Sequence, residues 1–136
     1  MKVDPERYAD LSGFRYALRQ FLAASEVINK AAGITQQQYQ AMLAIRAWPG
    51  ATMATKDLAD QLLLTHHAAV QLVDRLEKLD LVQRDPSEDD RRVVLLKLSG
   101  SGETLLAHLV DQHLAEIRGQ EPQLTRTLSR IRDARG

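Results

Sequence analysis

The stretch that decides the fold is TKDLADQLLLTHHAAVQLVDRLEKLDLVQRDPSEDDRRVVLLKLS, residues 55–99. Thr55 and Thr65 are typical N-cap residues, because a threonine hydroxyl accepts a hydrogen bond from a free backbone N–H at a helix start. They predict a short helix from Lys56 to about Leu63 and a longer one from His66 to about Leu79. Two helices separated by about two residues form a helix-turn-helix.

The second half of this stretch has the pattern of a β-hairpin. Asp80 follows the longer helix where glycine is usual, and we expect it to adopt the left-handed backbone conformation at a modest cost. Leu81–Arg84 is predicted to form a short strand, Asp85–Asp90 a turn, and Arg91–Leu98 the returning strand. A hairpin with a polar tip directly after a helix-turn-helix is a wing.

Two further helices are predicted on the N-terminal side of this stretch. The first begins at Asp4-Pro5 and ends at Gly33. The second begins with the capping box Thr35–Gln38 and ends before Pro49. Each carries an apolar face at helical spacing, which predicts burial: Leu11, Phe14, Leu18, Phe21, Leu22 and Ile28 in the first, and Tyr39, Met42, Leu43 and Trp48 in the second.

Two helices are also predicted after the wing. Ser99 caps one that runs to about Arg118, Gly119 and Pro122 interrupt it, and the last spans about Gln123 to Ala134. The apolar stripe of the longer helix is broader than one packing partner would cover, which favours a second subunit: Leu105, Leu106, Leu109, Val110, Leu114 and Ile117. The basic residues of the last helix are expected to face that subunit or a DNA backbone: Arg126, Arg130, Arg132 and Arg135.

The predicted fold class is mainly α with a small β-hairpin wing, in a single domain over residues 1–136. Residues 4–32 and 100–136 are the predicted dimerisation helices, and residues 35–99 the winged helix-turn-helix region. A length of 136 residues, with 44% hydrophobic and 26% charged residues, is typical of one folded globular domain. The absence of an apolar run long enough for a membrane helix or a secretion signal predicts a cytoplasmic protein with no membrane partner.

Composition also excludes several chemistries. Without cysteine there is no disulfide framework, thiolate zinc site, cysteine nucleophile or thiol-based redox sensor. The net charge is zero, so nucleic-acid binding must come from local placement of charges. Segment 65–99 has seven acidic and six basic side chains, so attraction to phosphate is expected to be weak unless the carboxylates face away from DNA or pair with arginines.

The order of these elements resembles the MarR (multiple antibiotic resistance regulator) family of winged-helix repressors over about residues 8–118. The motifs that carry the resemblance are Thr35–Trp48, Asp57–Leu62, Val73–Glu77 followed by Leu81–Arg84, and Asp90–Arg92 followed by Leu98-Ser99, which fits the family's Asp-x-Arg-x5-Leu-(Ser/Thr) signature. The resemblance implies a homodimer that binds a double-stranded, pseudo-palindromic operator, with recognition helices in major grooves and wing arginines in the minor groove. It implies a repressor without catalysis or cofactor.

Helical spacing turns Ala69, Leu72, Val73 and Leu76 of the longer helix toward the core, which leaves the opposite face for DNA. On that face Gln71 can contact adenine, Val70 a thymine methyl, and the adjacent histidines guanine or phosphate. The candidate DNA-binding residues are Thr65, His66, His67, Val70, Gln71, Arg75, Arg84, Asp90, Arg91 and Arg92. The resemblance makes Arg92 the principal wing arginine and Asp90 its orienting partner, while either Arg91 or Arg92 could reach deeper into the minor groove.

Each of these patterns also has a less specific interpretation. The charges at 88–92 alone could form a solvated loop whose ion pairs contribute little. His66 and His67 are more often surface residues than base readers, and adjacent histidines on a helix point away from each other. His108 and His113 are five residues apart rather than four, which disfavours zinc, and we expect both to cover the dimer or ligand-pocket surface.

The aromatic and methionine residues have two interpretations. Phe14, Phe21, Tyr39, Met42 and Trp48 are predicted to be core residues. Regulators of this family often bind a small aromatic or phenolic effector between the dimerisation helices and the reading region, so the same five residues are the candidate effector pocket. Such an effector would act by changing the spacing of the two recognition helices.

DNA binding has two rival function classes. The alternative is a winged-helix protein–protein interaction module that does not bind DNA, which the acidic balance of residues 65–99 would suit. An enzyme is disfavoured, because no nucleophile stands with a base and a third orienting group.

Overall fold

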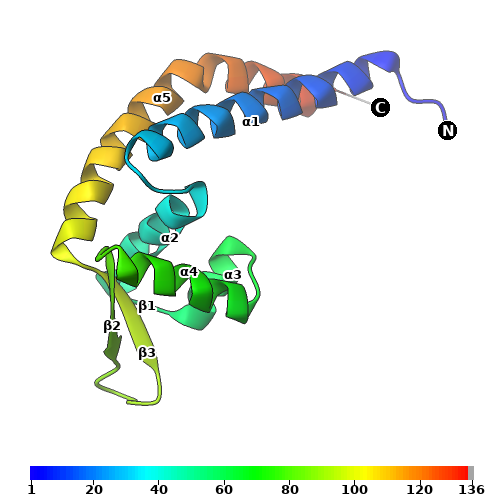
Figure 1. Ribbon diagram of the computed structural model, residues 1–136. Coiled ribbons are helices and arrows are strands. Elements are labelled where there is room, and N and C mark those ends of the chain that lie inside the picture. The colour runs from blue at the N-terminus through cyan, green and yellow to red at the C-terminus, as the bar shows by residue number, and fades with distance from the viewer. Residues whose placement is uncertain (135–136) are drawn as a thin grey trace.

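Figure 1 shows a computed structural model that describes residues 1–134. Arg135 and Gly136, the end of the predicted segment 100–136, lie outside the described residues. The elements in chain order are α1 (Pro5–Ala31), α2 (Gln36–Ala47), the 3-10 turn η1 (Pro49–Ala51), β1 (Met53–Ala54), α3 (Thr55–Leu62), α4 (His66–Lys78), β2 (Val82–Pro86), β3 (Val94–Leu98) and α5 (Gly100–Asp133). The architecture is mainly helical with a small β wing, as predicted.

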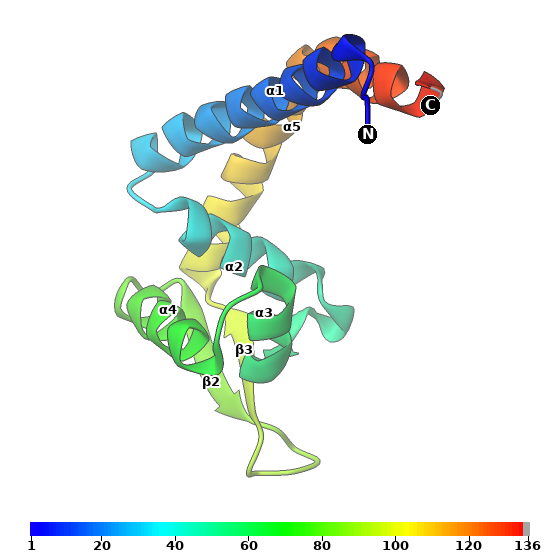
Figure 2. The ribbon, with the colours of Figure 1, turned by 90° about the vertical axis from the view of Figure 1, so that its right-hand side faces the viewer.

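The chain forms a compact winged-helix part and a projecting arm. In Figures 1 and 2, α1 and the second half of α5 run side by side in opposite directions and leave the compact part as a two-helix arm. The compact part packs α2, α3, α4 and the sheet around a continuous core that includes Met42, Leu58, Leu76, Leu96 and, from α5, Leu109. The first half of α5 is therefore the structural link between the wing and the arm.

Four of the five predicted helix caps are present, at Asp4, Thr35, Thr65 and Ser99. Asp4 Oδ1 accepts a hydrogen bond from Glu6 N at 3.0 Å, Thr35 forms the capping box with Gln38, and Thr65 Oγ1 accepts from Ala68 N at 3.1 Å. The cap predicted at Thr55 is wrong, because Thr55 is already inside α3 and Ala54 precedes it without a side-chain bond. Met53 and Ala54 pair with β3 in the sheet, and the chain passes from this pairing straight into α3.

The sheet has three antiparallel strands in the order β1-β3-β2. The sequence predicts the hairpin but not β1, because a two-residue strand carries no readable alternation. The strands also differ in extent from the prediction: β2 continues to Pro86, which pairs with Val94, and β3 begins only there. Ser87 N donates to Val93 O at 2.8 Å and closes the tip, so Arg91–Val93 belong to the turn.

The break predicted at Gly119 and Pro122 is wrong, since α5 continues through both residues to Asp133. A proline inside a helix costs about 3 kcal/mol in removed hydrogen bonding and steric clash. Packing against α1 along the arm offsets that cost, and Gln123 Nε2, one residue beyond the proline, donates to Gln20 Oε1 of α1 at 3.0 Å. Within residues 1–134, no helix combines the length and apolar character needed to cross a membrane.

Several residues of the predicted apolar helix faces are exposed in the single chain. They are Leu43 on α2, Leu11, Leu18 and Leu22 on α1, and Leu114 and Ile117 on α5. Leu11 is 57% exposed, although its face of α1 has the apolar spacing of a packed helix. The arm thus carries apolar surface that its own two helices do not cover.

Candidate nucleic-acid interface

The helix α4 separates a buried face from an exposed polar face, as its spacing predicts. Ala69, Leu72, Val73 and Leu76 are buried against the core. The predicted contact residues of α4 and its N-cap lie outside the core. Val70 is half-buried, and the others are exposed: Thr65, His66, His67, Gln71 and Arg75. Their common exposure on one helix is what a groove-reading surface requires.

The turn before α4 is held by a residue in the left-handed conformation. Leu63 has φ 55° and ends α3, and Leu64 N donates to Ala59 O at 2.9 Å. Asp80 has φ 58° after α4, which confirms the left-handed conformation predicted for it. These two turns fix where α4 starts and where the wing leaves it.

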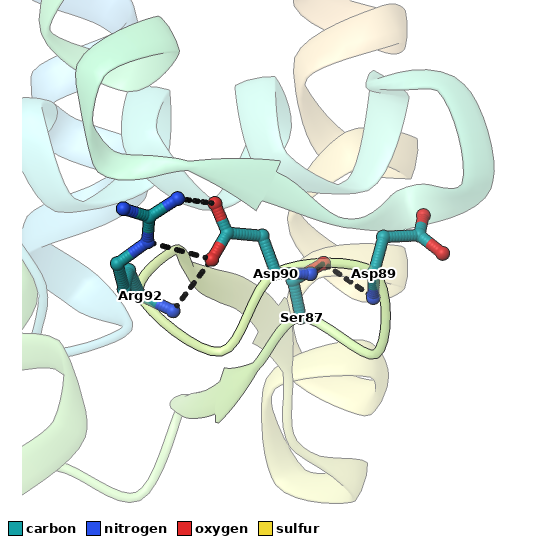
Figure 3. A network of polar contacts seen from close by, with 4 residues as sticks. All are labelled: Ser87, Asp89, Asp90 and Arg92. Atoms are coloured by element: carbon teal, nitrogen blue, oxygen red, sulfur yellow. Dashed lines mark hydrogen bonds and ion pairs between the residues drawn. The ribbon is translucent and has the colours of Figure 1, made fainter.

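The wing tip is a small network of hydrogen bonds around Asp90 (Figure 3). Ser87 Oγ accepts from the backbone N–H of Asp89 at 3.3 Å and of Asp90 at 3.4 Å. Asp90 Oδ1 accepts from Arg92 N and Arg92 Nε, both at 3.1 Å, and Asp90 Oδ2 accepts from Arg92 Nη2 at 3.3 Å. The turn therefore holds the carboxylate, and the carboxylate holds the guanidinium.

This pairing presents a charged side chain to solvent in a defined orientation. The Arg92 side chain is 91% exposed although both carboxylate oxygens of Asp90 bind it. The hydrogen bonds from the Arg92 side chain and backbone lower the pKa of Asp90, so its carboxylate stays ionised and able to orient Arg92. Arg91 is exposed and forms no ion pair with any residue of 1–134, so the two wing arginines differ in how they are held.

Arg84, predicted at the base of the wing, turns its guanidinium onto α4. Arg84 Nη2 lies 2.7 Å from Asp74 Oδ1, and Nη1 lies 3.1 Å from Glu77 Oε1. Nη2 also donates to the backbone carbonyl of Val70 at 3.5 Å. The Arg84 side chain is only 26% exposed, so this predicted DNA contact is already engaged within the chain.

Ion pairs within residues 65–99 engage most of the carboxylates of this segment and leave its net charge unchanged. Four of the seven carboxylates are paired: Asp74 and Glu77 with Arg84, Asp85 with Lys97 at 3.2 Å, and Asp90 with Arg92. Among the residues that the structure describes, three cations of this segment have no such partner, Arg75, Lys78 and Arg91, and neither do three carboxylates, Asp80, Glu88 and Asp89. DNA binding by this segment requires carboxylates that either face away from DNA or pair with arginines, and Asp74, Glu77 and Asp90 meet the second condition.

The base of the wing is anchored to the start of α5. Ser99 N donates to Leu81 O at 3.0 Å, Ser99 Oγ donates to Asp80 O at 2.5 Å, and Gly102 N donates to Ser99 Oγ at 2.9 Å. Gly102 is buried with its Cα face against the Leu81 backbone. The sequence identifies Ser99 as a cap but not Gly102, whose signal is a glycine in the first turn of a helix where alanine would be more favourable.

The structure does not gather the five residues of the predicted effector pocket. Tyr39 and Met42 are core residues and Trp48 packs against that core, whereas Phe14 and Phe21 are half-buried on α1 of the arm. An open surface pocket of about 380 Å³ between α2 and α5 is lined instead by Leu43, Arg46, Glu103 and Val110, among others. The core interpretation therefore holds for Tyr39 and Met42.

His113 is buried, and the prediction that it covers a surface is wrong. Its ring stacks on Tyr39 with centroids 4.0 Å apart and planes 7° apart. Nε2 lies 2.8 Å from Ser25 Oγ of α1, and Nδ1 lies 2.7 Å from Leu109 O. One side chain of α5 thus joins α1 and α2 where the arm meets the compact part, while His108 is exposed.

Comparison with known proteins places this arrangement in a family. A family model described as MarR family matches residues 32–93, from the end of α1 to the wing tip. The HTH-type transcriptional regulator FarR of Neisseria gonorrhoeae is 34% identical over 104 residues, which cover 72% of this chain and 69% of that protein. The organic hydroperoxide resistance transcriptional regulator of Bacillus subtilis (strain 168) is 35% identical over 78 residues, which cover 57% of this chain and about half, 52%, of that protein.

Solved structures share the fold at lower identity. AbsC, a MarR family transcriptional regulator from Streptomyces coelicolor, superposes with a TM-score of 0.79 at 20% identity, over 88% of this chain and 81% of that chain. A mutant of MarR from E. coli, solved in complex with operator DNA, gives a TM-score of 0.66 at 22% identity, over 82% and 76% of the two chains. The family model and the match to FarR, together with this shared winged-helix fold, show that the chain belongs to the MarR family of transcriptional regulators.

Proposed function

We propose that this protein binds a pseudo-palindromic operator as a homodimer and represses transcription by occluding a promoter. The proposal rests on the wing tip, where Asp90 binds the exposed guanidinium of Arg92. This wing follows a helix-turn-helix whose outer face is polar and exposed. A guanidinium held in this way suits the narrow minor groove of an A·T-rich stretch. The same proposal places the protein in the cytoplasm, where operator DNA lies.

In this proposal α4 enters the major groove. Gln71 is exposed near the middle of the helix and can form a bidentate contact with adenine, while the half-buried Val70 beside it can pack on a thymine methyl. His66 and His67 lie in the first turn, where they can donate to guanine or phosphate. The E. coli MarR structure with operator DNA supports the proposal, because the same fold binds DNA there.

The homodimer is supported by the uncovered apolar surface of the arm. Leu11, Leu18 and Leu22 of α1 are exposed, as are several residues of α5: Leu114, Ile117, Leu128 and Ile131. An exposed apolar surface spread along two helices is typical of a protein interface. A twofold partner on this arm would set the two copies of α4 about one helical turn of DNA apart, roughly 34–36 Å.

For the small aromatic effector, the open surface pocket between α2 and α5 is a better candidate than the five predicted residues, which the structure does not bring together. Its volume of about 380 Å³ is in the range of small-molecule sites. It combines apolar surface from Leu43 and Val110 with the Arg46 guanidinium, which pairs with Glu103 at 3.0 Å. An effector bound here would be detected by its ability to release the protein from DNA in a competition titration.

Selecting bound fragments from the host's own DNA tests the proposed function and identifies the target together. We expect recovered fragments to share a pseudo-palindrome whose half-sites are one helical turn apart. Recovery of no enriched sequence, with no binding to any DNA at low salt, would favour the protein-interaction alternative.

Replacing Arg92 by alanine should weaken operator binding by about 1–3 kcal/mol, because one oriented guanidinium per subunit is lost from the minor groove. Folding should be unaffected, since the side chain is 91% exposed. Anisotropy titrations of Arg92→Ala and of Arg91→Ala form the matched pair, and the loss should be larger for Arg92, the arginine that Asp90 holds. Wild-type affinity in Arg92→Ala would remove the wing from the mechanism.

Replacing Gln71 by alanine should change which sequences bind rather than whether DNA binds. The cost should be about 1–3 kcal/mol on the best operator and close to nothing on operators altered at the one position that Gln71 reads. Repeating the fragment selection with Gln71→Ala measures this directly. An unchanged base preference at every position would show that Gln71 does not read bases.

A further inference from the structure

We propose that Arg84 is a positioning residue that holds the carboxylates of Asp74 and Glu77 away from the phosphate backbone, and that it does not itself contact DNA. This inference rests on the proposed DNA-binding function. Arg84 then affects DNA binding through the carboxylates of α4, whereas the sequence predicts that Arg84 contacts DNA directly.

The position of Arg84 in the sheet determines which groups its side chain reaches. It occupies the middle of β2, opposite Leu96 of β3, so its backbone is fixed by the sheet. Its guanidinium reaches three groups on one edge of α4: the carbonyl of Val70 and the carboxylates of Asp74 and Glu77. Positions 70, 74 and 77 are successive neighbours along one side of a helix, so one planar guanidinium spans them.

The negative charges of Asp74 and Glu77 make their contact with Arg84 relevant to DNA binding. Asp74 and Glu77 lie on the helix that would enter the major groove, and their side chains are about half exposed at 51% and 48%. Left free, they would repel phosphates on a surface whose attraction to DNA is already limited. Bound to Arg84, both carboxylates are directed toward β2 and share one positive charge.

The energetics argue against a purely stabilising role for the same pairs. Partly exposed ion pairs contribute only about 0–1 kcal/mol to folding. With both guanidinium Nη atoms already bonded to α4, a phosphate contact by Arg84 would require it to leave partners at 2.7 and 3.1 Å. The structure thus favours a role in which Arg84 offsets the negative charge beside α4 and orients the carboxylates of Asp74 and Glu77.

The test measures operator affinity by anisotropy for Arg84→Gln alone and for Arg84→Gln combined with Asp74→Asn and Glu77→Gln. We expect Arg84→Gln to weaken binding on the order of tenfold, and the triple variant to recover most of that loss because no free carboxylate remains. Arg84→Lys should bind with intermediate affinity, since an ammonium cannot span both carboxylates. Circular dichroism should show all of these variants folded.

A matched control separates this specific effect from net charge. Arg84→Gln combined with Glu88→Gln and Asp89→Asn has the same net charge as the triple variant, but it removes wing-tip carboxylates that form no ion pair with residues 1–134. This control should recover much less affinity. Equal recovery by both triple variants would show that only net charge matters, and recovery by neither would show that Arg84 contacts DNA directly. Either result would overturn the inference, whereas failure of the wild-type protein to bind any DNA would refute the proposed function instead.

Discussion

Replacing Gly102 by alanine should lower the free energy of unfolding by about 3 kcal/mol, at the upper end of the cost of overpacking. In an open helix the same change would stabilise the protein by about 0.5–1 kcal/mol, because glycine is the poorer helix former. At position 102 a β-carbon would clash with the carbonyl oxygen of Leu81 and lie 3.0 Å from its carbonyl carbon. Backbone atoms cannot rotate away, so the start of α5 would separate from the base of the wing.

Chemical denaturation at fixed protein concentration measures this change, because dimer formation makes apparent stability depend on concentration. Gly119→Ala is the matched control on the same helix. Gly119 is exposed, and a β-carbon there would meet nothing within 4 Å, so this variant should be as stable as wild type or slightly more stable. A Gly102→Ala variant that also gained stability would show that α5 is not docked on Leu81.

Replacing His113 by alanine should lower the free energy of unfolding by about 2–4 kcal/mol, as large-to-small changes in a core do. The change would remove the stack on Tyr39 and the bonds to Ser25 and Leu109, and would leave a cavity around Ser25, itself buried. Since His113 joins the arm to the compact part, we also expect looser coupling between the two copies of α4 in the dimer.

Two variants separate the contributions of the His113 ring. His113→Phe keeps a ring that can stack on Tyr39 but loses both polar contacts, so its stability should lie between those of wild type and His113→Ala. His108→Ala, on the exposed side of the same helix, should change stability by less than about 0.5 kcal/mol. Equal stabilities of His113→Ala and His108→Ala would contradict the contacts assigned to the buried ring.

The features that the sequence predicts well are those decided by neighbouring residues. The capping box at Thr35, the cap at Thr65 and the left-handed Asp80 each depend on a few adjacent residues, and the structure confirms them. The inward face of α4 follows from spacing alone. The pairing of Asp90 with Arg92 is also local, since the two are separated by one residue.

The features that the sequence misses depend on segments far apart in the chain. Strand β1 exists because β3 pairs with it, and α5 stays continuous at Pro122 because α1 packs along it. Likewise, the spacing of His113 gives no sign of its stack on Tyr39, 74 positions earlier in the chain. Propensity and spacing describe one element at a time, whereas these outcomes are set by tertiary contacts.

The most direct test of DNA binding by α4 and the wing is an anisotropy titration of wild-type protein with a selected operator across salt concentration. We predict tight, sequence-selective binding whose affinity falls steeply and log-linearly as salt rises, with a shallower slope for Arg92→Ala because one phosphate-proximal cation per subunit is gone. Absence of binding to any DNA at low salt would contradict the account and leave a winged helix that contacts proteins.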